Sequence, residues 1–85
     1  MDAQQIQYIY NQNVCKGFLL YCKHHRINIT SILNTPGKIT RQSVYAVSNG
    51  KIKYLPFIAL CYLSEILGLK TPSNLEQYYI KTQSN

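Results

Sequence analysis

The chain has 85 residues, 46% of them hydrophobic, and nine basic residues against three acidic ones give a net charge of +6. This length suits one compact domain rather than two, and the apolar content excludes a wholly disordered chain. The acids are Asp2, Glu65 and Glu76, so residues 3–64 carry no negative side chain. A long segment of one sign favours a polyanionic partner, either nucleic acid or an anionic membrane surface.

The first half of the chain predicts two helices. The first runs from about Ala3 to His24, although Gly17 costs it about 1 kcal/mol relative to alanine. Asn28 is a suitable N-cap for a short second helix through residues 32 and 33, and the Thr-Pro-Gly at 35–37 ends it. The apolar stripe of the first helix has helical spacing and comprises Ile6, Ile9 or Tyr10, Val14, Phe18 and Tyr21.

The second half predicts three more helices. Thr40 caps a third helix over 41–48 that turns Val44 and Val47 inward and ends at Asn49-Gly50. Pro56 suits the first turn of a fourth helix, which Gly68 terminates. The apolar stripe of this helix is Phe57, Leu60, Leu63 and Leu67.

Thr71-Pro72-Ser73 opens a fifth helix, and the ends of the chain are expected to fray, the tail from about Lys81. The predicted fold class is therefore all-α, with five helices in a single domain of residues 1–85 and a core over about 14–75. The fifth helix carries Leu75, Tyr78, Tyr79 and Ile80, which form a reasonable surface for a homodimer.

The segment PGKITRQSVYAVSNGK, residues 36–51, resembles the recognition region of the Cro/CI-like (XRE) helix-turn-helix family, and residues 39–51 match its pattern without a gap. The similarity extends over about Val14–Leu75. The chain departs from the pattern in four places. Lys38 is an extra turn residue, and one more residue is inserted before Pro56. Ile29 stands where many relatives have glutamine, and Cys22 replaces a common arginine. The resemblance implies a lambda-repressor-like domain that binds double-stranded DNA, often as a dimer.

The residue types of the third helix agree with that reading. Arg41, Gln42 and Tyr45 lie opposite the inward valines, where a recognition helix meets base edges. Arginine can bond guanine and glutamine can bond adenine in the major groove, and a tyrosine can pack on a thymine methyl. Phosphate contacts are expected from the surrounding short polar and cationic residues. These are Lys38, Thr40, Ser43, Asn49, Lys51 and Lys53. A capping role alone also explains Thr40 and Asn49.

Other basic and metal-binding residues give weaker signals. Lys16, Lys23 and Arg26 form either a second phosphate edge or an ordinary solvated face, and the second is favoured. A zinc site is not expected, because no spacing among the candidate ligands matches a structural motif. These ligands are Cys22, His24, His25 and Cys61. No cofactor is expected, and the scarcity of acids argues against an enzyme.

The cysteines favour a reducing compartment. Cys15 and Cys22 lie seven residues apart on one helix, about 10 Å, which is too far for a disulfide. We expect three buried, reduced thiols in a cytoplasmic protein. The N-terminus has no pattern of a signal peptide. The most apolar stretch, 54–69, spans about 24 Å as a helix, short of the roughly 30 Å hydrocarbon core, and is expected to be a buried helix.

The function predicted from the sequence is a sequence-specific DNA-binding transcriptional regulator, expected to be a repressor, that reads the major groove with helix 41–48. The main alternative is a protein-interaction module on the same scaffold, as in a small phage or plasmid regulator that modulates another protein. The outward residues Arg41, Gln42 and Tyr45 favour the first reading, because a protein-docking module does not need them. A membrane-surface peptide is the least favoured alternative.

Overall fold

A computed structural model of the chain describes residues 2–33 and 39–84. Within these ranges the fold is all-α, as predicted, and consists of five helices without a strand. Their bounds are α1 Ala3–His24, α2 Ile29–Ile32, α3 Arg41–Ser48, α4 Phe57–Glu65 and α5 Pro72–Ser84. The predicted Thr-Pro-Gly stop at 35–37 lies outside the described residues.

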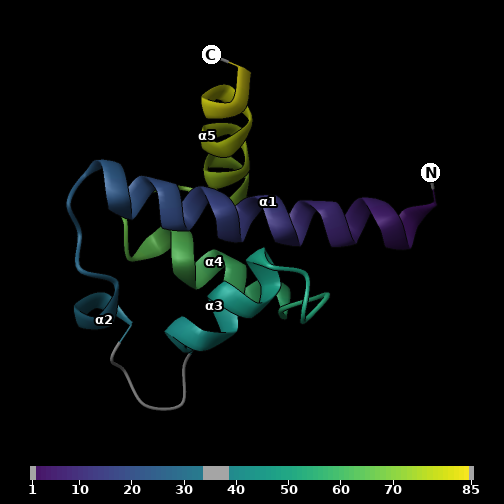
Figure 1. Cartoon of the computed structure of the whole chain (residues 1–85), viewed down its shortest axis with the longest axis horizontal. Helices are drawn as coiled ribbons and strands as arrows, with labels where there is room; N and C mark the ends of the chain where they lie inside the picture. Colours follow the sequence, from purple (N-terminus) through teal and green to yellow (C-terminus); the bar gives the residue numbers. More distant parts are fainter. Residues whose placement is uncertain (1, 34–38, 85) are drawn as a thin grey trace.

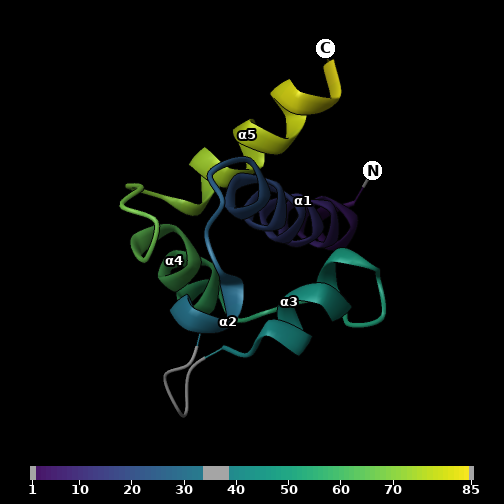
Figure 2. The same ribbon diagram turned by 60° about the vertical axis from the view of Figure 1, so that its left-hand side comes forward.

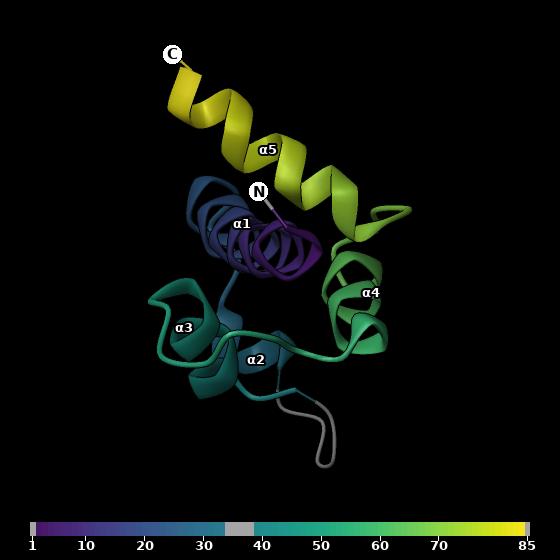
Figure 3. The same cartoon turned by 90° about the vertical axis from the view of Figure 1, so that its right-hand side faces the viewer.

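Helix α1 is the central element of the fold. It packs against α5 on one side and against α3 and α4 on the other, and α4 also contacts α5 (Figure 1). The views in Figures 2 and 3 show α5 crossing above α1, with α3 and α4 below it and α2 near the start of α3. Helix α5 thus forms a layer on one side of α1, and α3 and α4 form a layer on the other side. The buried apolar side chains are Val14, Cys15, Phe18, Cys22, Leu33, Val44, Val47, Leu60, Leu63 and Leu75.

Gly17 explains how α5 approaches α1 so closely. A Cβ atom at Gly17 would lie 2.0 Å from the Leu75 carbonyl oxygen and 2.7 Å from its carbonyl carbon. These are backbone atoms, so a side chain here would force the two helices apart. The helical cost that the sequence predicts for Gly17 is therefore offset by a close crossing, and α1 continues through it without a break.

Capping side chains begin α2 and α3 at the predicted residues. Asn28 accepts a hydrogen bond from the Ser31 amide at 3.2 Å, and Thr40 accepts one from the Ser43 amide at 3.1 Å. Asp2 forms a capping box with Gln5, and Pro72 is the first residue of α5. Gly50 follows the end of α3 with a positive φ angle of 80°. The sequence predicts that Gly68 ends α4, but this helix already ends at Glu65, and Gly68, with a φ angle of 74°, closes the turn after it.

Two predictions about the chain ends are wrong. Helix α5 continues beyond Lys81 to Ser84, and the Thr82 hydroxyl donates to the Tyr78 carbonyl oxygen at 2.8 Å in this last part. At the other end, Ile6 and Ile9 of the expected stripe are exposed, whereas Tyr10, the alternative to Ile9, is half-buried against the core. The first turns of α1 extend beyond the crossing with α5, where no other helix covers them (Figure 1).

The apolar stripe predicted for α4 is only partly buried. Leu60 and Leu63 are buried and Leu67 is half-buried, but Phe57 is 64% exposed. Its neighbour Ile58 is 79% exposed, so the expected buried helix in 54–69 has one open face. The periodicity predicts which side of the helix faces the core, but it does not show which of its first residues the rest of the fold leaves uncovered. In the described residues no helix is long and apolar enough to cross a membrane.

The cysteine predictions hold for two of the three thiols. Cys15 and Cys22 are buried and free, whereas Cys61 is free but only half-buried on α4. Burial raises the pKa of the Cys15 thiol from 9.0 to about 12 and that of Cys22 to about 11. Among the described residues, no group of three or more His, Cys, Asp or Glu side chains could hold a metal ion.

Candidate nucleic-acid interface

Helix α3 separates an apolar inner face from a polar outer face. Val44 and Val47 have no exposed surface, as the sequence predicts. Arg41, Gln42 and Tyr45 are exposed on the other side of the helix. Their backbone is fixed by the Thr40 cap at one end and by Gly50 at the other. The three side chains are therefore presented by a short, well-anchored helix.

The outer face of α3 continues into the turn that follows it. A shallow hollow of about 450 Å³ is lined by Ala46 together with polar and basic residues from α3 and the turn. The Lys51 amide donates to the Ala46 carbonyl oxygen at 2.8 Å, which holds the turn against the helix. The remaining lining residues are Arg41, Gln42, Tyr45, Asn49 and Lys51. The structure thus brings together all three predicted base-reading residues and two of the predicted phosphate-binding ones.

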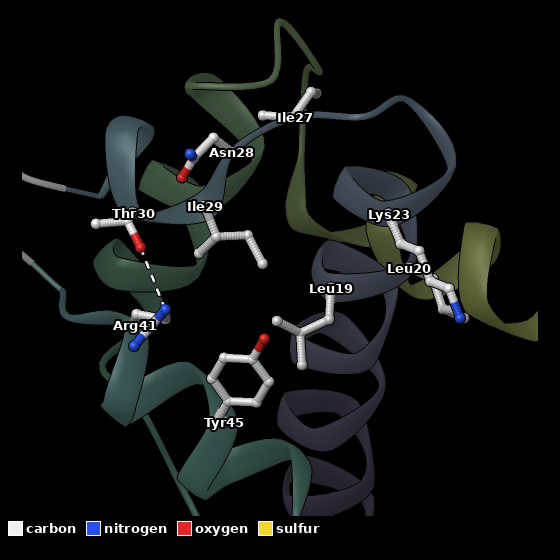
Figure 4. Close-up of a pocket in the computed structure, with 9 residues that line it drawn as sticks. All are labelled: Leu19, Leu20, Lys23, Ile27, Asn28, Ile29, Thr30, Arg41 and Tyr45. Carbon is white, nitrogen blue, oxygen red and sulfur yellow. Dashed lines mark hydrogen bonds between the residues drawn. The ribbon is translucent and has the colours of Figure 1, made fainter.

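A second hollow of about 430 Å³ adjoins the first, and Arg41 and Tyr45 line both. Figure 4 shows that α1, α2 and α3 all contribute to it, with Leu19 and Ile29 among its apolar residues. The Arg41 Nη1 atom donates to the Thr30 hydroxyl at 3.2 Å, and the dashed line in Figure 4 marks this bond. Thr30 therefore holds the Arg41 guanidinium at the rim of the hollow.

The sequence does not single out Thr30, indicates Asn28 only as a helix cap, and favours a solvated face over a phosphate edge for Lys23. All three line the second hollow together with Arg41, although Thr30 lies 11 residues away in the chain. Only the fold brings α2 next to the start of α3, so no local pattern could reveal the contact. The sequence favours a solvated face for Lys23. In the structure, Lys23 lines the same hollow as Arg41.

Other predicted phosphate-binding residues lie elsewhere. The Thr40 and Ser43 hydroxyl oxygens are 2.9 Å apart, and Ser43 faces the groove between α3 and α4 rather than the hollow of Arg41. Lys53 lies beside the N-terminus of α1, in a depression that also includes Asp2 and Tyr54. Lys38 falls outside the described residues. Among the described basic residues, Lys53 thus lies apart from the hollow that Arg41 and Lys51 line.

Buried polar side chains hold the turn after α3 against α1. Asn11 donates from Nδ2 to the Gln7 carbonyl oxygen and accepts from the Leu55 amide, both at 2.9 Å. Gln12 donates to the Ser48 carbonyl oxygen at 3.3 Å. No buried side-chain polar atom in the described part of the chain lacks a hydrogen-bond partner. These hydrogen bonds fix the orientation of α3 relative to α1.

Lys16 lies on a different side of the molecule. Its Nζ atom is 5.4 Å from the centre of the Tyr79 ring of α5, which is a cation–π contact. Tyr78 of the same helix packs edge-on against Tyr21, and its hydroxyl oxygen forms a hydrogen bond with His24 Nδ1 at 2.6 Å. Leu75 is fully buried under α1. The C-terminal residues expected to form a dimer surface therefore serve mainly to attach α5, and only Ile80 stays exposed.

No protein-family model, curated protein or solved structure matches the chain.

Proposed function

We propose that this protein is a sequence-specific, double-stranded DNA-binding regulator of transcription that reads the major groove with α3. The observation that carries the proposal is the outer face of α3, where Arg41, Gln42 and Tyr45 are exposed over a fully buried inner face. A helix with its side chains is about 10–12 Å across, which fits the roughly 12 Å width of the major groove, and the eight residues of α3 extend for about 12 Å.

The contact between Arg41 and Thr30 supports this assignment. A bidentate bond from arginine to guanine requires the planar guanidinium to be held in one orientation. The Thr30 hydroxyl already restrains one nitrogen of the Arg41 group, so less side-chain entropy is lost when the base is bound. Gln42 and Asn49 on the same face supply amides that can read adenine or bond phosphate oxygens.

The charge distribution supports a DNA partner as well. The net charge of +6 comes with no acid between residues 3 and 64, and Arg41, Lys51 and Lys23 border the two hollows at α3. A surface of this sign attracts DNA through counterion release and leaves specificity to the base contacts. Occupation of a promoter excludes other proteins from the same DNA, so we expect the regulator to act as a repressor.

The proposed type of domain is a lambda-repressor-like helix-turn-helix. The order of the five helices and the exposed position of α3 support it. Helix α2 is only four residues long, and residues 33–40 separate it from α3, which exceeds the usual turn of about three or four residues. We therefore assign the reading of bases to α3 and restrict α2 to positioning Arg41.

Selection of bound fragments from a random duplex pool tests the proposal. The protein should enrich one motif, and the double variant Arg41→Ala/Gln42→Ala, altered only at exposed positions, should lose that enrichment. Failure of the wild-type protein to enrich any motif would contradict sequence-specific binding and would favour the protein-interaction alternative.

A further inference from the structure

Helix α4 has apolar residues on both of its sides. Leu60 and Leu63 face the core and are buried, whereas Phe57 is 64% and Ile58 is 79% exposed on the outside. The only charged residue of the helix is Glu65, at its last position. A helix that is apolar all round is normally covered on all sides. The described residues leave the outer side of α4 open.

A groove lies beside these exposed side chains. Its volume is about 530 Å³, and Ile58 forms part of its wall. The groove is largely apolar, with Ser43 and Glu65 as polar exceptions. Its other lining residues are Ile39, Leu55, Pro56, Ala59, Cys61 and Tyr62. We call Phe57, Ile58 and this groove the α4 face. When exposed apolar side chains lie beside an apolar groove, two copies related by a two-fold axis can each insert these side chains into the groove of the other.

The charge pattern favours a second copy as the occupant. Residues 54–69 contain no lysine, arginine or histidine and only one acid, whereas the rest of the chain carries all nine basic residues. Two chains of charge +6 repel each other wherever their basic surfaces meet. No basic residue lines the groove of the α4 face, so two copies can approach there without bringing lining cations together.

We propose that the protein forms a symmetric homodimer through the α4 face, in which Ile58 and Phe57 of each copy enter the groove of the other. Taking about 150–250 Å² for a large side chain, these two residues expose about 250 Å² per copy. A standard interface needs roughly 800 Å² per partner, so the groove walls must supply the remainder. The dimer is accordingly a weak one, with a dissociation constant in the micromolar range.

This dimer is independent of the proposed DNA binding, and it differs from a dimer built on α5. Leu75 is fully buried beneath α1, and Tyr78 contacts Tyr21 and His24 within the same chain. The α5 surface therefore offers Ile80 as its one large exposed apolar side chain in the described residues. A test must separate the two faces.

Sedimentation equilibrium of the full chain without DNA, from about 1 to 500 µM, tests the proposal across the micromolar range. The apparent mass should rise from 9.8 kDa towards twice that value. Ile58→Asp and Phe57→Asp should each raise the dissociation constant at least about tenfold, because both copies then place a carboxylate in an apolar groove. Ile58→Ala should act in the same direction with a smaller change. It keeps the helix if the charged variants fail to fold.

Two matched controls place the same charge on other exposed isoleucines. Ile6→Asp on α1 and Ile80→Asp on α5 should leave the dissociation constant unchanged. A wild-type chain that stays monomeric over the whole range, whether or not another protein binds the α4 face, would overturn the proposal. Loss of the dimer in Ile80→Asp with normal dimerisation of Ile58→Asp would overturn it too, and would place the interface on α5.

Discussion

Helices α3 and α4 have nearly equal lengths, eight and nine residues, and each buries one side in the same core. Their outer sides differ completely. The outer side of α3 presents Arg41 and Gln42, and that of α4 presents Phe57 and Ile58. The inner sides of both helices are buried in the core, so the fold alone does not explain why the outer sides differ. We infer a polyanion at α3 and an apolar surface at α4.

The largest expected effect concerns the inner side of α3. Val47→Asp should unfold the domain, because Val47 has no exposed surface and a buried, unpaired carboxylate costs several kcal/mol. A small domain has only about 5–15 kcal/mol of total stability. Gln42→Asp is the matched control, because it places the same charge on the exposed side of the same helix. Thermal melting by circular dichroism should distinguish the two, and an unchanged melting temperature for Val47→Asp would mean that α3 is rotated from its assigned orientation.

The next prediction compares the alkylation of the two buried thiols with that of the thiol on the α4 face. Burial raises the pKa of Cys15 from 9.0 to about 12, so at pH about 8 the thiolate fraction falls roughly a thousandfold. Cys22 is buried in the same way, whereas Cys61 is partly exposed on α4. Alkylation of dilute native protein should therefore modify one thiol per chain, and denatured protein should react at all three. Reaction of Cys15 as fast as Cys61 would contradict the packing of α1.

The sequence predicted the elements whose signals are local. The bounds of α1 and α3 agree with the prediction, because Thr40, Asn49 and Gly50 determine the ends of α3 through contacts with neighbouring residues. The inward orientation of Val44 and Val47 follows from helical spacing alone. These features need no knowledge of the rest of the fold.

The features that the sequence missed depend on distant contacts. The exposure of Phe57 depends on which other elements cover the start of α4, which periodicity does not contain. The role of Gly17 depends on the Leu75 backbone, and the restraint on Arg41 depends on Thr30. For the candidate site, the outer residues of α3 could be predicted, but their partners on α1 and α2 could not.

A smaller effect is expected on DNA binding, where substitutions in α3 should change the base preference and a substitution on the α4 face should not. Arg41→Ala and Gln42→Ala should each weaken binding to the selected motif by about 1–3 kcal/mol, roughly 5–150-fold, and much less on unrelated DNA. Both side chains are exposed, so stability should change by about 0.5 kcal/mol or less. Phe57→Asp should keep the base preference of the wild type, as measured by competition binding of single-base variants. Equal binding of the motif by wild type, Arg41→Ala and Gln42→Ala would remove α3 from the role of reader.

The smallest effect distinguishes two lysines on opposite sides of α1. Lys51 borders the hollow of Arg41, whereas Lys16 lies over the Tyr79 ring of α5. If the protein neutralises roughly five or six phosphates, the logarithm of the binding constant should fall against that of salt concentration with a slope near −5. Lys51→Ala should make this slope less steep by about 1 and weaken binding to all sequences alike, because a phosphate contact carries no base information. Lys16→Ala removes the same charge from the chain but should leave the slope unchanged, since α5 faces away from α3. Equal effects of both variants would mean that net charge alone, and not the surface of α3, attracts the DNA.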